Sequence, residues 1–123
     1  MRKESNQEIG KQGEIIAVKY LKKNRYKILH TNYRCKIGEI DIVAQNKENI
    51  IFIEVKTRRD NEYGYPSESV TYHKQRKISK VALHYLQKYD LFKYNVRFDV
   101  IEVWNEFLKP ETNHILNAFE FRE

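Results

Sequence analysis

The chain has 123 residues, of which 33% are charged and 41% hydrophobic, with a formal net charge of +6 and a pI near 9.3. This length predicts one domain, residues 1–123, with a real core, and the composition excludes a disordered or membrane-embedded chain. No apolar run approaches the roughly 18 residues of a membrane span, and the polar start Met1 to Glu8 does not resemble a signal peptide. We therefore expect a cytoplasmic protein without a membrane partner.

The net positive charge favours attraction to polyanions such as nucleic acid, although many basic proteins bind none. Cys35 is the only cysteine, which excludes an internal disulfide and a cysteine-based zinc site. The histidines show no paired metal-ligand spacing, so we expect structural or exposed roles for His30, His73, His84 and His114.

A capping box predicts the first helix, with Ser5 as the N-cap and Glu8 three residues later. The helix extends to about Lys23, because apolar or small residues recur along one side at helical spacing: Ile9, Gly13, Ile16, Ala17, Tyr20 and Leu21. Glu14 lies at the edge of this stripe, where it can lean toward a sheet or serve as a surface helix former.

Residues 25–34 predict a first strand, and two further alternating runs, residues 39–44 and 50–56, flank a polar stretch that predicts a β-hairpin. Alternation places Ile40, Ile42 and Ala44 on one face. A turn centred on residues 47–48 places Asp41 opposite Glu54, and Glu39 opposite Lys56.

Two carboxylates directly opposite each other, roughly 5 Å apart at Cβ, repel and destabilise a sheet unless a cation lies between them. Mg²⁺ needs only one or two protein carboxylates, so Asp41 and Glu54 suffice as its anchors. Lys56 would then lie beside a bound phosphate or the attacking water. An ordinary hairpin with a solvated polar face is the alternative, but these charges fall within the most apolar stretch of the chain.

The segment 57–66 is polar and broken by Gly and Pro, which predicts a loop beside the site. Arg58 and Arg59 are placed to contact phosphates, and Tyr63 and Tyr65 could stack on an unpaired base or belong to an ordinary mobile connection.

A second helix is predicted from about Ser69 to Tyr89. Its first half is basic, and Lys74, Arg76 and Lys77 form either a nucleic-acid-binding surface near the active edge or a solvated face.

Residues 95–104 predict a fourth strand, and residues 114–121 a short last strand. Arg97 and Asp99 interrupt an apolar face of the fourth strand and predict a buried pair that supports Glu39 or Lys56. The element order is α-β-β-β-α-β-β, which predicts an α/β domain with a mixed central sheet flanked by helices.

Asp41, twelve intervening residues and Glu54-Val55-Lys56 resemble the core of the PD-(D/E)xK nucleases, a superfamily that includes restriction endonucleases and Holliday junction resolvases. Ordered motifs at similar spacing more narrowly resemble the small bacterial YraN-like family, whose predicted activity is that of a nuclease. These motifs are Gly13-Glu14, Asn32-Tyr33-Arg34, Gly38-Glu39-Ile40-Asp41, Phe52 to Lys56 and Arg97-Phe98-Asp99. The resemblance covers residues 9–119, and Ile40 in place of Pro is usual for the family.

This resemblance implies a restriction endonuclease-like core and a Mg²⁺- or Mn²⁺-dependent nuclease that hydrolyses phosphodiester bonds in DNA, with a resolvase-like, structure-specific substrate as one expectation. Asp41, Glu54 and the Val55 carbonyl would hold the metal, and Lys56 would orient the water. Glu14 matches an acidic residue that joins the site in resolvase-like members.

Asn32, Tyr33 and Arg34 precede the metal strand, where they either contact substrate or are ordinary polar residues of an edge strand. A non-catalytic nucleic-acid-binding protein that keeps the fold is the rival hypothesis, and a purely structural hairpin domain is a third. A small domain that grips a branched duplex would benefit from two-fold symmetry, so a homodimer is one expectation.

Overall fold

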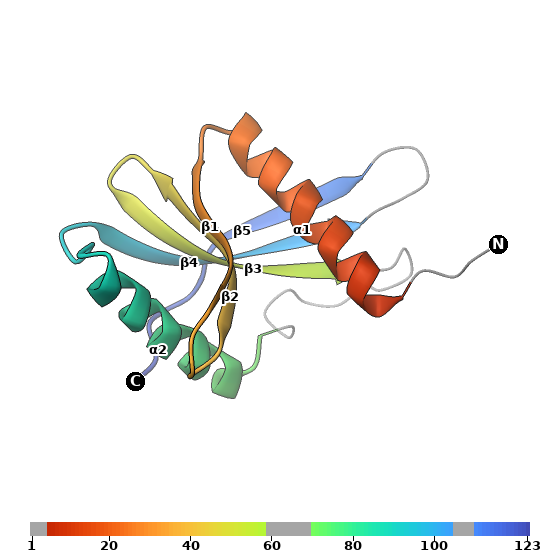
Figure 1. Ribbon diagram of the computed structural model, residues 1–123. Coiled ribbons are helices and arrows are strands. Elements are labelled where there is room, and N and C mark those ends of the chain that lie inside the picture. Colours follow the sequence, from red (N-terminus) through yellow and green to blue (C-terminus); the bar gives the residue numbers. More distant parts are fainter. Residues whose placement is uncertain (1–4, 59–69, 105–109) are drawn as a thin grey trace.

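The computed structural model describes residues 5–58, 70–104 and 110–123 (Figure 1). The predicted element order and the mixed α/β architecture are confirmed. In chain order the elements are α1 (Asn6–Lys23), β1 (Lys27–Arg34), β2 (Glu39–Asn46), β3 (Asn49–Arg58), α2 (Tyr72–Lys88), β4 (Asn95–Trp104) and β5 (Glu111–Phe119). Neither described helix is long and apolar enough to cross a membrane.

The five strands form one sheet in the order β1-β2-β3-β4-β5. Neighbouring strands are antiparallel except β3 and β4, which run parallel. A parallel pair needs a crossover connection, and α2 lies in the connection between these two strands. Helices α1 and α2 cover opposite faces of the sheet (Figure 1).

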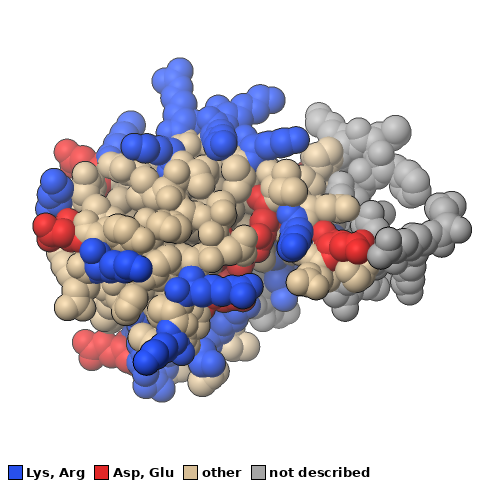
Figure 2. All heavy atoms as spheres, in the orientation of Figure 1, with Lys and Arg blue, Asp and Glu red and all other residues tan. Residues whose placement is uncertain are grey.

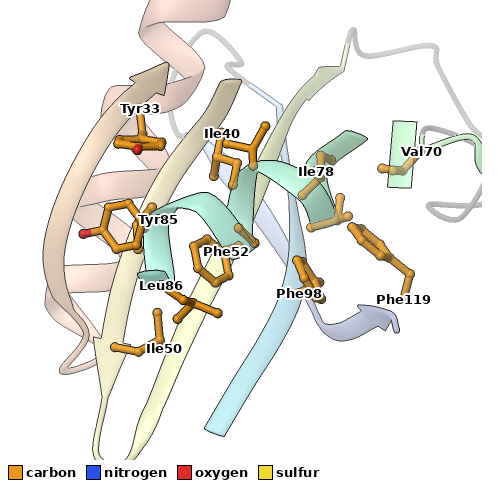
Figure 3. Close-up of a cluster of buried hydrophobic side chains, with 14 residues drawn as sticks. Tyr33, Ile40, Ile50, Phe52, Val70, Ile78, Tyr85, Leu86, Phe98 and Phe119 are labelled. Atoms are coloured by element: carbon orange, nitrogen blue, oxygen red, sulfur yellow. The ribbon is translucent and has the colours of Figure 1, made fainter. Parts of the chain in front are cut away.

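Each helix packs on its own hydrophobic core. The core under α2 is rich in aromatic side chains, and Figure 3 shows Phe52, Tyr85 and Phe98 packed beside one another. The core under α1 is aliphatic and consists of Ala17, Leu21, Ile42, Ala44, Ile51, Ile53, Ile101 and Val103. Because both faces are covered, the central strands are apolar on both sides.

The predicted register of the hairpin is confirmed. Residues from Ile42 opposite Ile53 to Asn46 opposite Asn49 are paired as expected. Both strands extend further into the polar stretch than the sequence predicted, and they leave only a two-residue turn. Lys47 has a φ of 56°, the left-handed conformation that tight hairpin turns require.

The predicted face of Ile40 is wrong. The ladder between β2 and β3 ends at Ile42, and beyond that point β2 remains paired with β1, where Ile40 lies opposite Tyr33. Both side chains pack in the core under α2, away from Ile42. Simple alternation fails here because β2 leaves β3 and because Asn32 of the paired strand takes a φ of 53°.

The predicted pair between Arg97 and Asp99 is confirmed, with Arg97 Nε 2.9 Å from Asp99 Oδ1. Asp99 is fully buried and also accepts hydrogen bonds from the His114 ring and the Asn117 backbone N–H. His114 in turn contacts the Tyr20 hydroxyl at 2.9 Å. The structural role predicted for this histidine is therefore confirmed.

The role predicted for that pair, the support of Glu39 or Lys56, is wrong. Arg97 is aligned with Ile51 on β3, whereas Lys56 is aligned with Glu102, five positions further along. At about 3.3 Å per residue along the strands, Arg97 and Lys56 are therefore separated by roughly 16 Å of backbone. The network instead joins β4 to β5 and to the end of α1. Strand β5 begins at Glu111, three residues earlier than predicted.

Replacing Asp99 by Ala should strongly destabilise the protein, because the guanidinium of Arg97 would lose its partner in the interior. We expect the free energy of unfolding to fall by about 3–5 kcal/mol in urea denaturation. The exposed variant Glu111→Ala is the control and should change it by less than about 0.5 kcal/mol. A loss for Asp99→Ala as small as that of the control would contradict this account.

Candidate metal and nucleic-acid site

The carboxylates of Asp41 and Glu54 lie where β2 and β3 diverge. Asp41 Oδ2 accepts a hydrogen bond from the backbone N–H of Val55 at 2.8 Å. The side chain of Asp41 therefore holds β2 and β3 together, one residue beyond Ile42 and Ile53, the last backbone pair of the two strands. Glu54 is the next residue on β3, and its side chain is 12% exposed.

Repulsion between the two carboxylates affects the protonation of Asp41. Burial and the charge of Glu54 raise the pKa of Asp41 to about 8, and the charge of Glu14 adds to the effect. The hydrogen bond from Val55 and the charge of Lys74 oppose the rise without cancelling it. At neutral pH and without a metal ion, the pair therefore retains a proton.

Lys74 supplies the positive charge nearest to this pair. Its ammonium lies 2.6 Å from Glu54 Oε1. The Thr71 hydroxyl caps α2 by accepting the N–H of Lys74, which fixes this residue in the first turn of the helix. Burial alone would lower the pKa of Lys74, but the hydrogen bond that its ammonium donates to Glu54 and the charges of Glu54, Asp41 and Glu39 raise that pKa above its usual value.

Glu14 approaches the pair from the opposite helix. Gly13 allows this approach, because a Cβ at position 13 would overlap the hydroxyl of Thr57 on β3. Glu14 is half-buried, and its charge raises the pKa of Asp41, as expected for a carboxylate that leans toward the sheet. This places Glu14 beside the pair.

Lys56 is half-buried two residues after Glu54 on β3, so the two side chains project from the same face. No ion pair joins Lys56 to another residue within the described ranges. Glu39 does not face Lys56 as predicted but pairs with Arg34 at 3.0 Å. The reason is again that the ladder between β2 and β3 ends at Ile42, whereas Glu39 is still paired with Arg34 on β1.

The predicted phosphate-binding residues differ in exposure and in their partners. Arg34 is 76% exposed at the rim, and Lys77 is exposed on α2. Arg76 donates to the backbone carbonyl of Glu123, which ties it to the end of the chain. Arg59, like Tyr63 and Tyr65, lies outside the described residues.

Arg58 does not present a free guanidinium to solvent. Its side chain is only 14% exposed and pairs with the buried Glu102 at 3.0 Å. Glu102 also accepts a hydrogen bond from Asn113. No sequence pattern indicated this pair, because Arg58 and Glu102 lie 44 residues apart and meet only through the pairing of β3 with β4. Arg58 therefore stabilises the edge of the site, and a role in phosphate binding is not supported.

The donor set fits a hard cation with few protein ligands. Within residues 5–58, 70–104 and 110–123, no three His, Cys, Asp or Glu side chains come together as a metal site. Two neighbouring carboxylates nevertheless satisfy the needs of Mg²⁺, which keeps several waters and takes phosphate oxygens. A divalent ion would also remove the repulsion that raises the pKa of Asp41. We conclude that Asp41 and Glu54 are suited to such an ion.

A sequence model of the uncharacterised protein family UPF0102 matches residues 13–103, which include every residue of this site. The chain belongs to this family. UPF0102 is the YraN family whose motifs the sequence resembles, so that resemblance is confirmed at the family level.

Three UPF0102 proteins illustrate the extent of the similarity. The relative from Caldanaerobacter subterraneus subsp. tengcongensis is 49% identical over 97% of this chain and 100% of its own length. The relative from Geobacter metallireducens is 50% identical over 94% of both chains. The relative from Clostridioides difficile is 50% identical over 94% of this chain and 99% of its own. The description of this family names no activity.

The raised pKa of Asp41 predicts an unusual pH dependence of this UPF0102 protein. Between about pH 4 and pH 8 the folded protein holds a proton that the unfolded chain has lost, so stability should fall as pH rises. Asp41→Asn removes this proton and keeps an acceptor for Val55. As pH rises, we expect the free energy of unfolding of wild type to fall by up to about 1.4 kcal/mol per pH unit more than that of the variant. At pH 8 the variant should therefore be more stable than wild type.

Urea unfolding in EDTA from pH 5 to pH 8 measures this difference. The exposed variant Glu120→Gln is the control and should keep the pH dependence of wild type. Parallel pH profiles for wild type and Asp41→Asn would show that the carboxylate pair holds no proton.

Proposed function

We propose that this UPF0102 protein is a metal-dependent nuclease that hydrolyses phosphodiester bonds in DNA. The observation that supports the proposal is the pair of half-buried carboxylates, Asp41 and Glu54, which repel each other beside Lys56 on the same strand. A repulsive pair costs stability, and its retention beside a basic residue is expected at a site that binds a cation and a phosphate.

In the proposed reaction each residue has a separate task. Asp41 and Glu54, with the backbone carbonyl of Val55, would hold Mg²⁺ or Mn²⁺. The ion supplies a Lewis acid for the phosphate and lowers the pKa of a water molecule. Lys56 orients that water or stabilises the charge that gathers on the phosphate. Glu14 acts from outside the immediate ligand set.

Lys74 has a double role in this proposal. Its ammonium neutralises Glu54 in this structure, and it would have to give up this contact if Glu54 held a cation. The cap of α2 at Thr71, three residues earlier, keeps Lys74 in the first turn of the helix. From there the ammonium would be available to a phosphate oxygen of the substrate. The net charge of +6 favours the approach of DNA.

The same ion pair favours a rival function. If Lys74 neutralises Glu54 permanently, the protein is a non-catalytic nucleic-acid-binding module that keeps the nuclease fold. The two functions differ in whether a divalent ion can displace the lysine. For the nuclease we further propose a resolvase-like substrate, a homodimeric state and a cytoplasmic location.

Cleavage assays test the proposed activity. Labelled branched, single-stranded and linear duplex DNA are incubated with wild type, Asp41→Asn and Glu54→Gln in Mg²⁺, Mn²⁺ or EDTA. We expect metal-dependent products from wild type and a loss of at least about 100-fold in both variants, because each lacks an anchor for the ion. The exposed variant Glu120→Gln should cleave like wild type. Cleavage that persists in EDTA or in Asp41→Asn would refute the proposed metal site.

Metal titration of a lysine variant separates the nuclease from its rival. Lys74→Met removes the cation that competes for Glu54, so Mn²⁺ affinity should rise by about three- to tenfold, as expected for a partly exposed ion pair of roughly 1 kcal/mol. Lys77→Met removes the same charge one turn away and should leave the affinity nearly unchanged. Calorimetry or Mn²⁺ electron paramagnetic resonance gives the measurement. If no variant binds Mn²⁺, the binding module is favoured.

A further inference from the structure

A groove lies between α1 and the edge strand β1, next to the candidate site. It has a volume of about 430 Å³ and is lined by Lys11, Glu14, Ile15, Val18, Lys19, Lys22, Thr31 and Asn32. Glu14 belongs both to this groove and to the surroundings of Asp41. Glu14 therefore connects the groove to the surroundings of the carboxylate pair.

The rim of the groove is basic. Lys11, Lys19 and Lys22 are all exposed, and Glu14 is the one acidic residue among the lining side chains. Figure 2 shows lysine and arginine side chains projecting along the upper side of the molecule, where α1 lies in Figure 1. From Lys11 to Lys22 the helix rises about 16 Å, a length that several consecutive phosphates of a nucleic acid strand can follow.

The floor of the groove differs from an ordinary solvated lysine face. Ile15 is 55% exposed between the lysines, and the half-buried Val18 lies one turn further along. The opposite wall is the edge of the sheet, where Thr31 and Asn32 are exposed and where β1, among the described strands, pairs only with β2. Apolar surface beside polar edge groups suits bases, which a duplex keeps stacked inside its own helix and a single strand leaves accessible.

We propose that the α1–β1 groove binds a single-stranded segment of the nucleic acid substrate. Its phosphates lie on Lys11, Lys19 and Lys22, its bases or sugars contact Ile15 and Val18, and the strand leads past Glu14 to the carboxylate pair. The inference rests on the proposed function and narrows it. The substrate class becomes DNA with an unpaired strand next to the scissile bond, as in flaps and branched junctions.

Binding without turnover tests the groove independently of cleavage. Fluorescence anisotropy in EDTA measures the affinity of wild type and Lys19→Ala/Lys22→Ala for a labelled single strand and for a duplex. We expect weaker single-strand binding and a salt dependence whose log–log slope is smaller by about 1.4, for two lost phosphate contacts. The control Lys47→Gly/Lys93→Ala removes two charges near the hairpin turn and the start of β4. It should keep the slope of wild type.

A second variant tests the apolar floor. Ile15→Ser keeps the charge and changes an exposed position, so the fold should be retained, which thermal unfolding verifies. We expect single-strand affinity to fall roughly three- to tenfold while duplex affinity is unchanged, because only an unpaired strand reaches the floor.

Each remaining outcome overturns the inference. If the lysine variant binds both DNAs like wild type, or loses no more than the control, the groove is not the binding surface. If single-strand and duplex affinities fall equally in the lysine variant and Ile15→Ser has no effect, the groove contacts only phosphates. Cleavage by wild type in the separate assay would leave the nuclease proposal standing in either case. Absence of both binding and cleavage by wild type would instead refute the proposed function.

Discussion

The repulsion between Asp41 and Glu54 is the constraint on which the rest of the site depends. The two carboxylates are brought together by a hairpin register that the apolar residues on both faces of β2 and β3 determine. Since a shift of one residue would turn every buried side chain to the other face, the core holds the carboxylates in place against their repulsion. The fold thus supplies the stability that the pair lacks.

Both helices bring a compensating or competing charge to this pair. Gly13 lets α1 approach β3 closely enough for Glu14 to act on Asp41, which increases the negative charge of the site. From the other face, α2 places Lys74 against Glu54. Three carboxylates gather here on a protein of net positive charge, and without a metal ion the pair balances its charge with one retained proton and the ammonium of Lys74. A divalent cation fits such a site better than the lysine alone, and the basic surroundings attract the polyanion that would bind with it.

Sequence reasoning succeeded where the interactions are local in the chain. The hairpin register and the carboxylate pair follow from spacing within one hairpin, and the capping of α1 by Ser5 follows from spacing within one turn of helix. It failed where the partner comes from a distant element. The pairing of Lys74 with Glu54 and the burial of Arg58 against Glu102 depend on how α2 and β4 pack, which the alternation of apolar residues does not determine. Ile40 and Glu39 were placed incorrectly because the pairing of β2 with β3 ends at Ile42, while its pairing with β1 continues to Glu39.

We propose that the space between Asp41 and Glu54 is a divalent cation site. Crystals soaked in Mn²⁺ and measured at the manganese absorption edge test it directly, since anomalous scattering locates the ion without assumptions about activity. The account predicts an anomalous peak bonded to both carboxylates, with the Lys74 ammonium moved away from Glu54. Crystals without a peak at these residues, in which Lys74 still pairs with Glu54, would contradict it.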